Sequence, residues 1–207
     1  VVVYPIPVPS YSALESRGCP PFTTLITSSA SLANSSFSWD LDGNGTQDTT
    51  ASVFYWTWED SGVYDVILTV TSPEGCESVV PIYQYITVYP EPIADFSLDP
   101  TETSLLDAFV NGDASTTIGA DSLLFWQFGD GNSATGEYVE NLYLDTGSYV
   151  VYLTAWNNYG CLDVDSQLVR ITPDYVFYAP NAFTPNSDGF NDVFFPKGIG
   201  IDLNNFE

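Results

Sequence analysis

The sequence contains no histidine and no methionine, and only 3 lysine and arginine residues stand against 27 aspartate and glutamate residues in a chain of 207. The absence of histidine excludes Ser-His-Asp and Cys-His catalysis and histidine-ligated metal centres. The formal net charge of -24 excludes nucleic acid as a natural partner and disfavours anionic membranes, because both carry negative charge. Any hydrolytic chemistry would have to depend on carboxylates alone.

Long hydrophobic runs are also absent, and no transmembrane segment is predicted. The first residues show neither the basic region nor the apolar region of a signal peptide. Hydrophobic residues nevertheless make up 44% of the chain, which is too many for a disordered acidic tail. We therefore expect folded domains with an acidic surface. Three cysteines, a single lysine and many threonine, tyrosine and valine residues favour an exported protein.

The sequence repeats with a period of 85 residues, the distance from Gly62 to Gly147. Three pairs of segments match at this distance: 3–7 with 88–92, 61–70 with 146–155, and 74–76 with 159–161. Such a period predicts tandem modules. Because Val88 and Tyr89 close the first repeat, we expect residues 1–4 to be the last strand of an upstream repeat. The chain would then be an excerpt from a longer array.

Within each repeat the pattern is that of β-strands. Apolar residues alternate with other side chains over residues 64–71, and clusters of Asp, Asn, Gly, Ser and Pro interrupt the chain at short intervals. No stretch shows the apolar stripe of a helix. Short antiparallel strands in a unit of this size predict an all-β fold of two facing sheets. Trp39 and Trp126, which recur at a matching place, are expected in the cores.

The second repeat carries the motif Trp126-Gln127-Phe128-Gly129-Asp130-Gly131, followed by Tyr143 and then Gly147-Ser148-Tyr149. This combination resembles the PKD domain, an immunoglobulin-like β-sandwich of extracellular proteins. The first repeat departs from the pattern, since Trp58 stands where the family has tyrosine. The resemblance implies tandem immunoglobulin-like β-sandwiches, PKD-like domains over residues 5–90 and 91–173. It implies spacer or adhesive modules and no catalytic residues, so we do not expect an enzyme.

After the second repeat, residues 178–194 resemble the start of the gliding-motility-associated C-terminal domain, the type B sorting signal of type IX secretion. The residues that carry this resemblance are Pro180, Asn181, Phe183, Thr184, Pro185, Asn186, Asp188, Gly189, Asn191 and Asp192. It implies that residues 174–207 begin a truncated sorting domain. It also implies export across the outer membrane to the cell surface, with an outer-membrane translocon and sorting components as partners.

Two of the three cysteines are expected to form a disulfide. Cys19 precedes a strand of the first repeat, and Cys76 lies in a turn near its end. A bond between them would close a long loop and restrain the unfolded chain. Ser104 stands at the position of Cys19 in the second repeat, so Cys161 is expected to be a free thiol or to pair outside this chain.

A loop of the first repeat has the spacing of a calcium site. Oxygen ligands fall at loop positions 1, 3, 5, 7 and 9, the seventh through a backbone carbonyl: Asp40, Asp42, Asn44, Thr46 and Asp48. Position 12, which carries a bidentate glutamate in such loops, is Ala51. The alternative is a hairpin turn without metal, because Asp, Asn and Gly favour such turns.

We expect the C-terminal part of a large secreted adhesin or gliding-motility-type protein. The alternative is a carbohydrate-binding accessory region of a secreted polysaccharide-degrading enzyme, with surface glycans as partners. Four aromatic residues could stack on sugars: Trp56, Tyr83, Tyr85 and Trp156. Outward aromatic residues in strands more often form cross-strand pairs.

Overall fold

The computed structural model describes residues 2–174, 176–178, 187 and 197–199. Its internal contacts divide the chain into two compact units. Unit 1 comprises residues 1–93, 119–122 and 155–163, and unit 2 comprises residues 94–118, 123–154 and 164–207. Two short segments of the second sequence repeat therefore pack with the first repeat.

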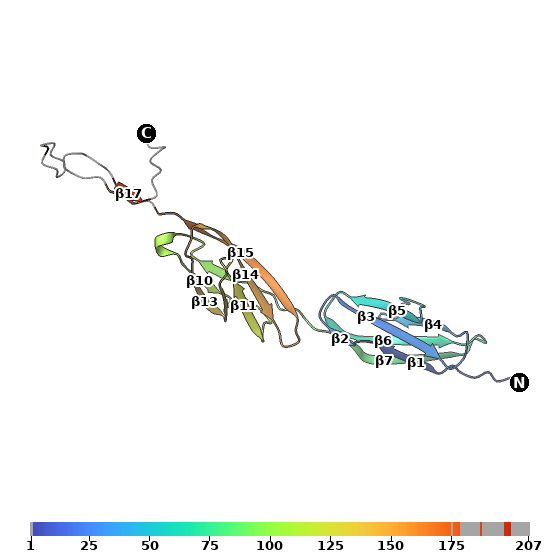
Figure 1. Ribbon diagram of the computed structural model, residues 1–207. Helices are drawn as coiled ribbons and strands as arrows, with labels where there is room; N and C mark the ends of the chain where they lie inside the picture. Colours follow the sequence, from blue (N-terminus) through green and yellow to red (C-terminus); the bar gives the residue numbers. More distant parts are fainter. Residues whose placement is uncertain (1, 175, 179–186, 188–196, 200–207) are drawn as a thin grey trace. The chain divides into compact units, whose positions relative to one another are not determined.

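Unit 1 is a sandwich of two sheets (Figure 1). One sheet has the order β1 (Pro9–Ala13), β3 (Phe22–Ala30), β5 (Val53–Trp58). The other has the order β2 (Arg17–Gly18), β7 (Glu77–Val88), β6 (Gly62–Thr71), β4 (Ser36–Asp40). All neighbouring strands are antiparallel except β2 and β7, which are parallel.

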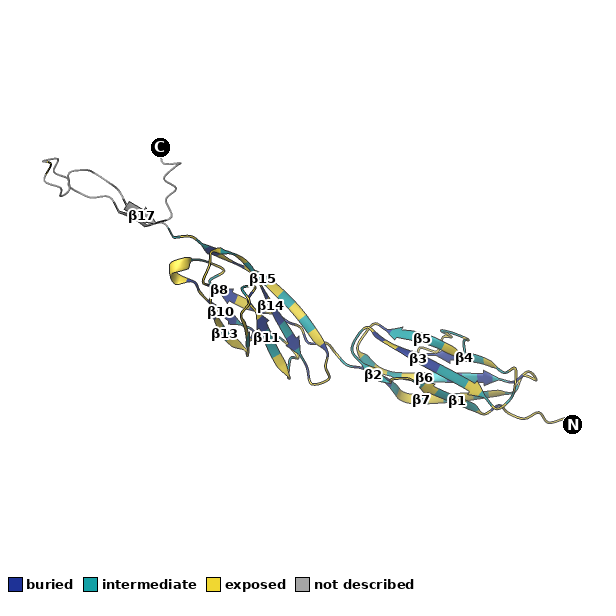
Figure 2. Cartoon of the chain, viewed as in Figure 1, coloured by how far each residue is buried: buried dark blue, intermediate teal, exposed yellow. Residues whose placement is uncertain are grey.

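The alternation in the sequence produces the core of unit 1. Side chains of a strand point alternately to its two faces, so one face of each sheet can be apolar. Val66, Leu68 and Val70 on β6 are fully buried, and Ile26 on β3 faces them from the other sheet. Figure 2 shows the same alternation of buried and exposed residues along the strands.

Unit 2 is also built from two sheets. One has the order β13 (Tyr138–Leu142), β10 (Phe109–Asp113), β8 (Ser97–Asp99). The other has the order β12 (Ser133–Thr135), β11 (Leu123–Gln127), β14 (Gly147–Trp156), β15 (Leu162–Thr172), β9 (Glu102–Ser104). A single 3-10 turn, η1 (Leu105–Asp107), follows β9. The end of β14 and the start of β15 are counted with unit 1.

The two units have the same strand topology, with β12 as an addition in unit 2. The parallel pair β2 and β7 of unit 1 recurs as the parallel pair β9 and β15 of unit 2. Each unit also has its own cluster of buried residues. The predicted fold class, tandem immunoglobulin-like β-sandwiches, is confirmed.

The upstream repeat to which residues 1–4 are predicted to belong is not present in this chain, so that assignment stays a prediction. Residues 2–7 have no regular secondary structure, and Val2 and Val3 are exposed. The matching residue Val88 ends β7, where it pairs with β2 and β6. Val3 has no such strand beside it, and an isolated segment cannot form a ladder of hydrogen bonds.

The sorting motif lies outside the described residues. Of the chain beyond Asp174, the backbone is described in β16 (Val176–Tyr178) and β17 (Lys197–Ile199), which pair antiparallel. All ten residues of the predicted motif fall between these strands and are not described: Pro180, Asn181, Phe183, Thr184, Pro185, Asn186, Asp188, Gly189, Asn191 and Asp192.

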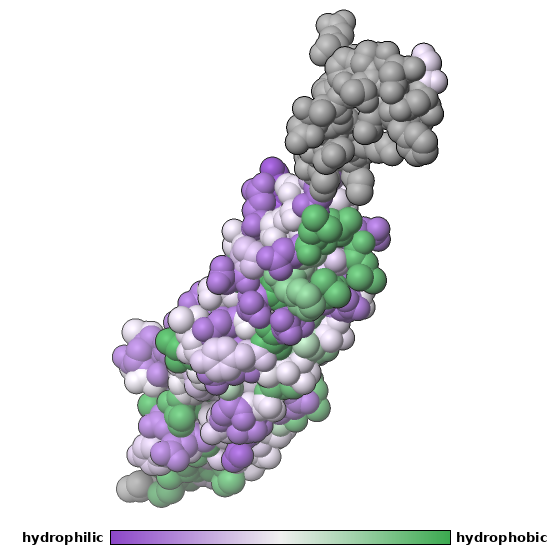
Figure 3. Space-filling view, turned by 90° about the vertical axis from the view of Figure 1, so that its left-hand side faces the viewer, coloured by the Kyte–Doolittle hydropathy of each residue, from purple (hydrophilic) through white to green (hydrophobic). Residues whose placement is uncertain are grey.

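None of the described residues belongs to a helix with the length and apolar character that a membrane crossing needs. On the face in view, Figure 3 shows hydrophobic side chains gathered in separate patches between hydrophilic ones.

The two core tryptophans differ in how their indole N–H groups are satisfied. Trp126 Nε1 donates a hydrogen bond to the Gly136 carbonyl at 2.9 Å. Trp39 is fully buried, and among the described residues its Nε1 has no hydrogen-bond partner. An unpaired buried donor loses its bond to water without replacement. The core of unit 1 therefore carries an uncompensated polar group that unit 2 avoids.

The two core tryptophan rings also differ in the residue that lies at the matching position of the facing sheet, Gly112 in unit 2 and Ile26 in unit 1. A Cβ at Gly112 would lie 2.9 Å from the Trp126 ring, so the ring occupies space that a side chain would need. In unit 1 the matching position is Ile26, because Ile26 pairs with Phe54 as Gly112 pairs with Val139. The Ile26 side chain fills this part of the core in unit 1.

We expect Trp126→Phe to destabilise the protein by about 1 kcal/mol more than Trp39→Phe, since a hydrogen bond contributes about that much net free energy. Both changes remove a similar ring area, and only Trp126→Phe breaks a bond. Denaturant unfolding followed by circular dichroism measures the two losses. An equal or larger loss in Trp39→Phe would contradict the assigned partner.

Tyr143 and Trp58 occupy matching places in the two cores. The Tyr143 hydroxyl donates to the Phe128 carbonyl at 3.0 Å, and Trp58 Nε1 donates to the Leu41 carbonyl at 3.0 Å. Burial raises the pKa of Tyr143 from 10.0 to about 12, and the negative charge of Asp130 acts in the same direction. The indole of Trp58 makes the same bond without a titrating group.

Stability should therefore fall in alkaline solution through Tyr143. A raised pKa in the folded state stabilises below the unfolded pKa of 10.0, and this contribution is lost as the pH rises towards about 12. We expect Tyr143→Phe to be less stable than the parent at pH 8 and to lose less further stability between pH 10 and pH 12. Urea unfolding at a series of pH values tests this. Parallel losses in both proteins would show that Tyr143 does not titrate as inferred.

Candidate functional site

The strongest candidate site is the loop that follows β4 in unit 1. Asp40 ends β4 and is buried, with 8% of its surface exposed. The loop is closed by two backbone hydrogen bonds: Trp39 N to the Thr49 carbonyl at 2.9 Å, and Asp48 N to the Trp39 carbonyl at 2.7 Å. Asp40 and Asp48 are therefore brought together at its base.

Three carboxylates converge in this loop. One oxygen from each of Asp40, Asp42 and Asp48 can be chosen so that all lie within 4.8 Å of one another. The sequence has no lysine or arginine between Arg17 and Arg170 to offset this charge nearby along the chain. Carboxylate oxygens are the hard ligands that Ca²⁺ prefers, so these residues fit a calcium ion in chemistry and proximity.

Backbone amides already use part of this ligand set. The two carboxylate oxygens of Asp40 accept from the amides of Gly43 and Gly45, both at 2.8 Å. Asp48 Oδ2 accepts from the Leu41 amide at 2.7 Å. These bonds hold the turn without a cation, and they also orient the carboxylates towards a common region.

Asn44 and Thr46 make hydrogen bonds within the turn. Asn44 Nδ2 donates to Asp42 Oδ2 at 2.8 Å, and Asn44 Oδ1 accepts from the Thr46 amide at 2.7 Å. The one side-chain oxygen of Asn44 is therefore engaged within the turn. The structure brings the carboxylates of Asp40, Asp42 and Asp48 together and places Asn44 beside Asp42, and metal binding stays a prediction.

The matching turn of unit 2 satisfies its acid with amides. Asp130 Oδ2 accepts from Asn132 Nδ2 at 3.0 Å and from Asn141 Nδ2 at 2.8 Å. Asn141 is buried on β13. Gln127 stands at the end of β11 where unit 1 has Asp40 at the end of β4. Unit 2 is therefore an internal control for the carboxylate loop.

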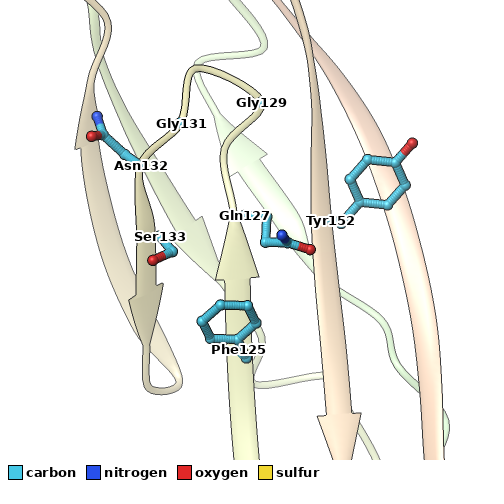
Figure 4. Close-up of a pocket in the computed structure, with 7 residues that line it drawn as sticks. All are labelled: Phe125, Gln127, Gly129, Gly131, Asn132, Ser133 and Tyr152. Atoms are coloured by element: carbon cyan, nitrogen blue, oxygen red, sulfur yellow. The ribbon is translucent and has the colours of Figure 1, made fainter.

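A shallow pocket of about 370 Å³ lies on the outer face of the larger sheet of unit 2. Figure 4 shows the residues that line it: Phe125, Gln127, Gly129, Gly131, Asn132, Ser133 and Tyr152. Phe125 and Gln127 lie two residues apart on β11, so they share one face, with Tyr152 on the neighbouring β14. The lining contains amides, two hydroxyls and two aromatic rings but no carboxylate, so it offers no pair of acids for glycoside hydrolysis.

The four aromatic residues considered for sugar stacking are in different environments. Trp56 and Tyr85 are half-buried and pack against the core of unit 1, and Tyr85 makes an edge contact with Tyr11. Tyr83 is 74% exposed, and Trp156 is half-buried. The positive φ of 51° at Gln84 interrupts the regular alternation between Tyr83 and Tyr85. The structure does not present them as four equally exposed rings.

The predicted disulfide between Cys19 and Cys76 is wrong. Cys19 is bonded to Cys161, with Cα atoms 5.4 Å apart, and Cys76 is free. The prediction considered only partners within one repeat. In the structure, residues 155–163 of the second repeat pack with unit 1, and Cys161 in this segment is bonded to Cys19.

The backbone near Cys19 explains this pairing. Tyr89 N donates to the Gly18 carbonyl at 2.8 Å, so Cys19 lies beside the end of the first repeat. Asn157 Nδ2 donates to the Pro90 carbonyl at 2.8 Å, and the rings of Tyr89 and Tyr159 stack with centroids 4.0 Å apart. These contacts within unit 1 place the turn that contains Cys161 next to Cys19.

The family of PKD domains matches residues 89–172, so this part of the chain carries a PKD domain. The comparison with curated proteins gives no match.

Solved structures that are similar to this chain include two PKD1 domains from Vibrio. That of the Vibrio cholerae metalloprotease PrtV is 26% identical, with a TM-score of 0.34 over 39% of this chain and 96% of that one. That of Vibrio anguillarum Epp is 21% identical, with a TM-score of 0.35 over 41% and 96%. The fibronectin(III)-like modules of Clostridium thermocellum CbhA are 14% identical, with a TM-score of 0.36 over 79% and 95%.

Calcium should stabilise the protein through the carboxylate loop. A ligand present at 100 times its Kd adds about 2.7 kcal/mol to the unfolding free energy, and a chelator should remove this gain. We expect Asp42→Asn to abolish most of the gain and Asp130→Asn, the matched control in unit 2, to retain it. Thermal unfolding with calcium and with chelator measures both. A calcium gain that survives Asp42→Asn, or no gain in the parent protein, would eliminate the site.

Proposed function

We propose that this chain is the C-terminal part of an exported cell-surface protein, in which PKD-like sandwiches serve as spacer and adhesive modules. We further propose that residues 174–207 begin a sorting domain, which the type IX secretion machinery recognises for transport across the outer membrane. No catalytic role is assigned to the chain.

The observation that carries the spacer proposal is the repetition of one module. Both units use the same strand order, and each has a separate buried core. Matching hydrogen bonds also recur: the Tyr64 hydroxyl donates to the Asp60 carbonyl, as the Tyr149 hydroxyl donates to the Asp145 carbonyl. A module that repeats its core and its turns is suited to building length, because copies can be added without redesign of the fold.

The charge of the chain supports an exposed role. A net charge of -24 keeps a protein soluble and disfavours non-specific association with copies of itself. Most of the acidic side chains lie outside the cores, since Asp40 is the only carboxylate among the buried residues that the structure describes. An acidic surface of this kind suits a module that stands in solvent between other parts of a protein.

The sorting proposal depends on the sequence after the second repeat. The run from Asn181 to Asp192 resembles the opening of a type B sorting domain, and it begins nine residues after Thr172 ends β15. A signal in this place follows the last sandwich and leaves both cores intact. Export can then be directed by one segment while the sandwiches are passive cargo.

We expect a reporter fused to the C-terminal region of the natural protein, completed beyond Glu207, to reach the surface or medium of a host that has type IX secretion. Deletion from Val176 onward should retain the reporter inside the cell, because the recognised segment is gone. Immunoblots of cell, surface and medium fractions measure the distribution.

The matched control keeps length and composition and rearranges only residues 180–192. We expect this variant to be retained as the deletion is, while its sandwiches still give the parent circular dichroism spectrum. Unchanged export of the rearranged variant would contradict the sorting role and leave an array of PKD-like modules.

A further inference from the structure

We propose that Cys76 forms a disulfide with a cysteine of a preceding sandwich module, at the position that Cys19 has in the first repeat. The bond would link successive modules of the array in the way that Cys19 and Cys161 are linked here. This goes beyond the spacer role and shares with it only the need for an oxidising compartment outside the cytoplasm.

The turns that contain Cys76 and Cys161 have the same construction. Ser72 N donates to the Cys76 carbonyl at 2.8 Å, and Asn157 N donates to the Cys161 carbonyl at 3.0 Å. The amide of each cysteine in turn donates to a side-chain oxygen, Ser72 Oγ at 3.2 Å and Asn157 Oδ1 at 3.0 Å. The turn around the free Cys76 therefore has the same hydrogen bonds as the turn around the bonded Cys161.

The surroundings of the two sulfur atoms also match. Cys161 Sγ lies 4.0 Å from the Tyr89 carbonyl oxygen, and Cys76 Sγ lies 3.9 Å from the Tyr4 carbonyl oxygen. Tyr4 and Tyr89 are separated by the repeat period, as are Cys76 and Cys161. The chain at Tyr4 thus passes Cys76 as the chain at Tyr89 passes Cys161.

One difference remains between the two copies. Beside Tyr89 runs the segment that ends at Gly18 and supplies Cys19, and the bond buries Cys161 to 1% exposure. Cys76 is half-buried and free, and both other sulfur atoms of this chain are already used. A residue that pairs with Cys76 as Cys19 pairs with Cys161 would come from a module whose last segment is the one at Tyr4.

The spacing gives the position at which this residue would stand. Cys19 and Cys161 are 142 residues apart. The same separation, counted back from Cys76, falls in a preceding repeat at the place that matches Cys19. A module with a cysteine beside its β2-type strand would then be linked to the turn between the last two long strands of the next module, whereas the second repeat, with Ser104 at that position, donates none.

The reaction is a balanced oxidation of two thiols. The thiolate of one cysteine attacks a disulfide oxidant, such as oxidised glutathione or a thiol oxidoreductase, and forms a mixed disulfide. The second thiolate then displaces the reduced oxidant. Two protons and two electrons leave the protein, one sulfur–sulfur bond forms, and the oxidant disulfide becomes two thiols.

The test is an extended chain in which residues 1–88 are followed directly by residues 4–207, so that a copy of the first repeat precedes Tyr4 at the natural period. After folding in a glutathione redox buffer, free thiols are counted with a chromogenic disulfide reagent under denaturing conditions. We expect one free thiol per chain, Cys76 of the added copy. Non-reduced peptide mapping should show a Cys19–Cys76 linkage, and this linkage should disappear, leaving two free thiols, when Cys76 is replaced by serine in the original copy alone.

The matched control replaces Cys19 by serine in the added copy alone, and it should leave two free thiols. Three free thiols in the unsubstituted extended chain would overturn the proposal, as would a chain dimer joined through Cys76. Peptide mapping of the protein exported by its own cells is a second measurement that needs no engineered copy. There, Cys76 recovered as a free thiol or joined to a second Cys76 would also overturn the proposal, whereas failure of export would affect only the sorting role.

Discussion

Burial of one tryptophan ring between two facing sheets is the interaction on which each sandwich depends. Trp39 and Trp126 lie on matching strands and are fully buried, and strands from both sheets supply the residues around them. Loss of such a ring costs about 3–5 kcal/mol in protein cores, a large share of the stability of a small domain. The register of the strands follows from this burial, because a shift by one residue would turn the ring into solvent.

Around this shared core the two repeats have diverged mainly in their polar groups. Trp126 has a hydrogen-bond acceptor and Trp39 has none among the described residues. Trp58 in unit 1 takes the place of Tyr143 in unit 2 as the donor to the turn after β4 or β11. The turn itself holds three converging carboxylates in unit 1 and a single acid satisfied by amides in unit 2. The apolar framework tolerates these exchanges because the strand pairing does not depend on them.

The cysteines show how a repeat can mislead a prediction about pairing. Within one repeat, Cys19 and Cys76 look like natural partners, yet Cys19 is bonded to Cys161. The repeat boundary on the sequence is not the boundary of the packed units, because residues 155–163 join the contacts of unit 1. The bond therefore joins the first sequence repeat to a turn of the second, so it depends on two consecutive repeats and not on one alone.

The sequence alone determined the all-β class, the period, the core tryptophans and the carboxylate loop, because all of these depend on alternation and spacing along the chain. The tertiary structure decided which sulfur atoms meet, which carboxylates converge and whether Trp39 finds an acceptor. These outcomes depend on segments far apart in the chain, and spacing does not determine how such segments approach. Cys19 and Cys161 are 142 residues apart, and only the folded backbone at Gly18 and Tyr89 brings them together.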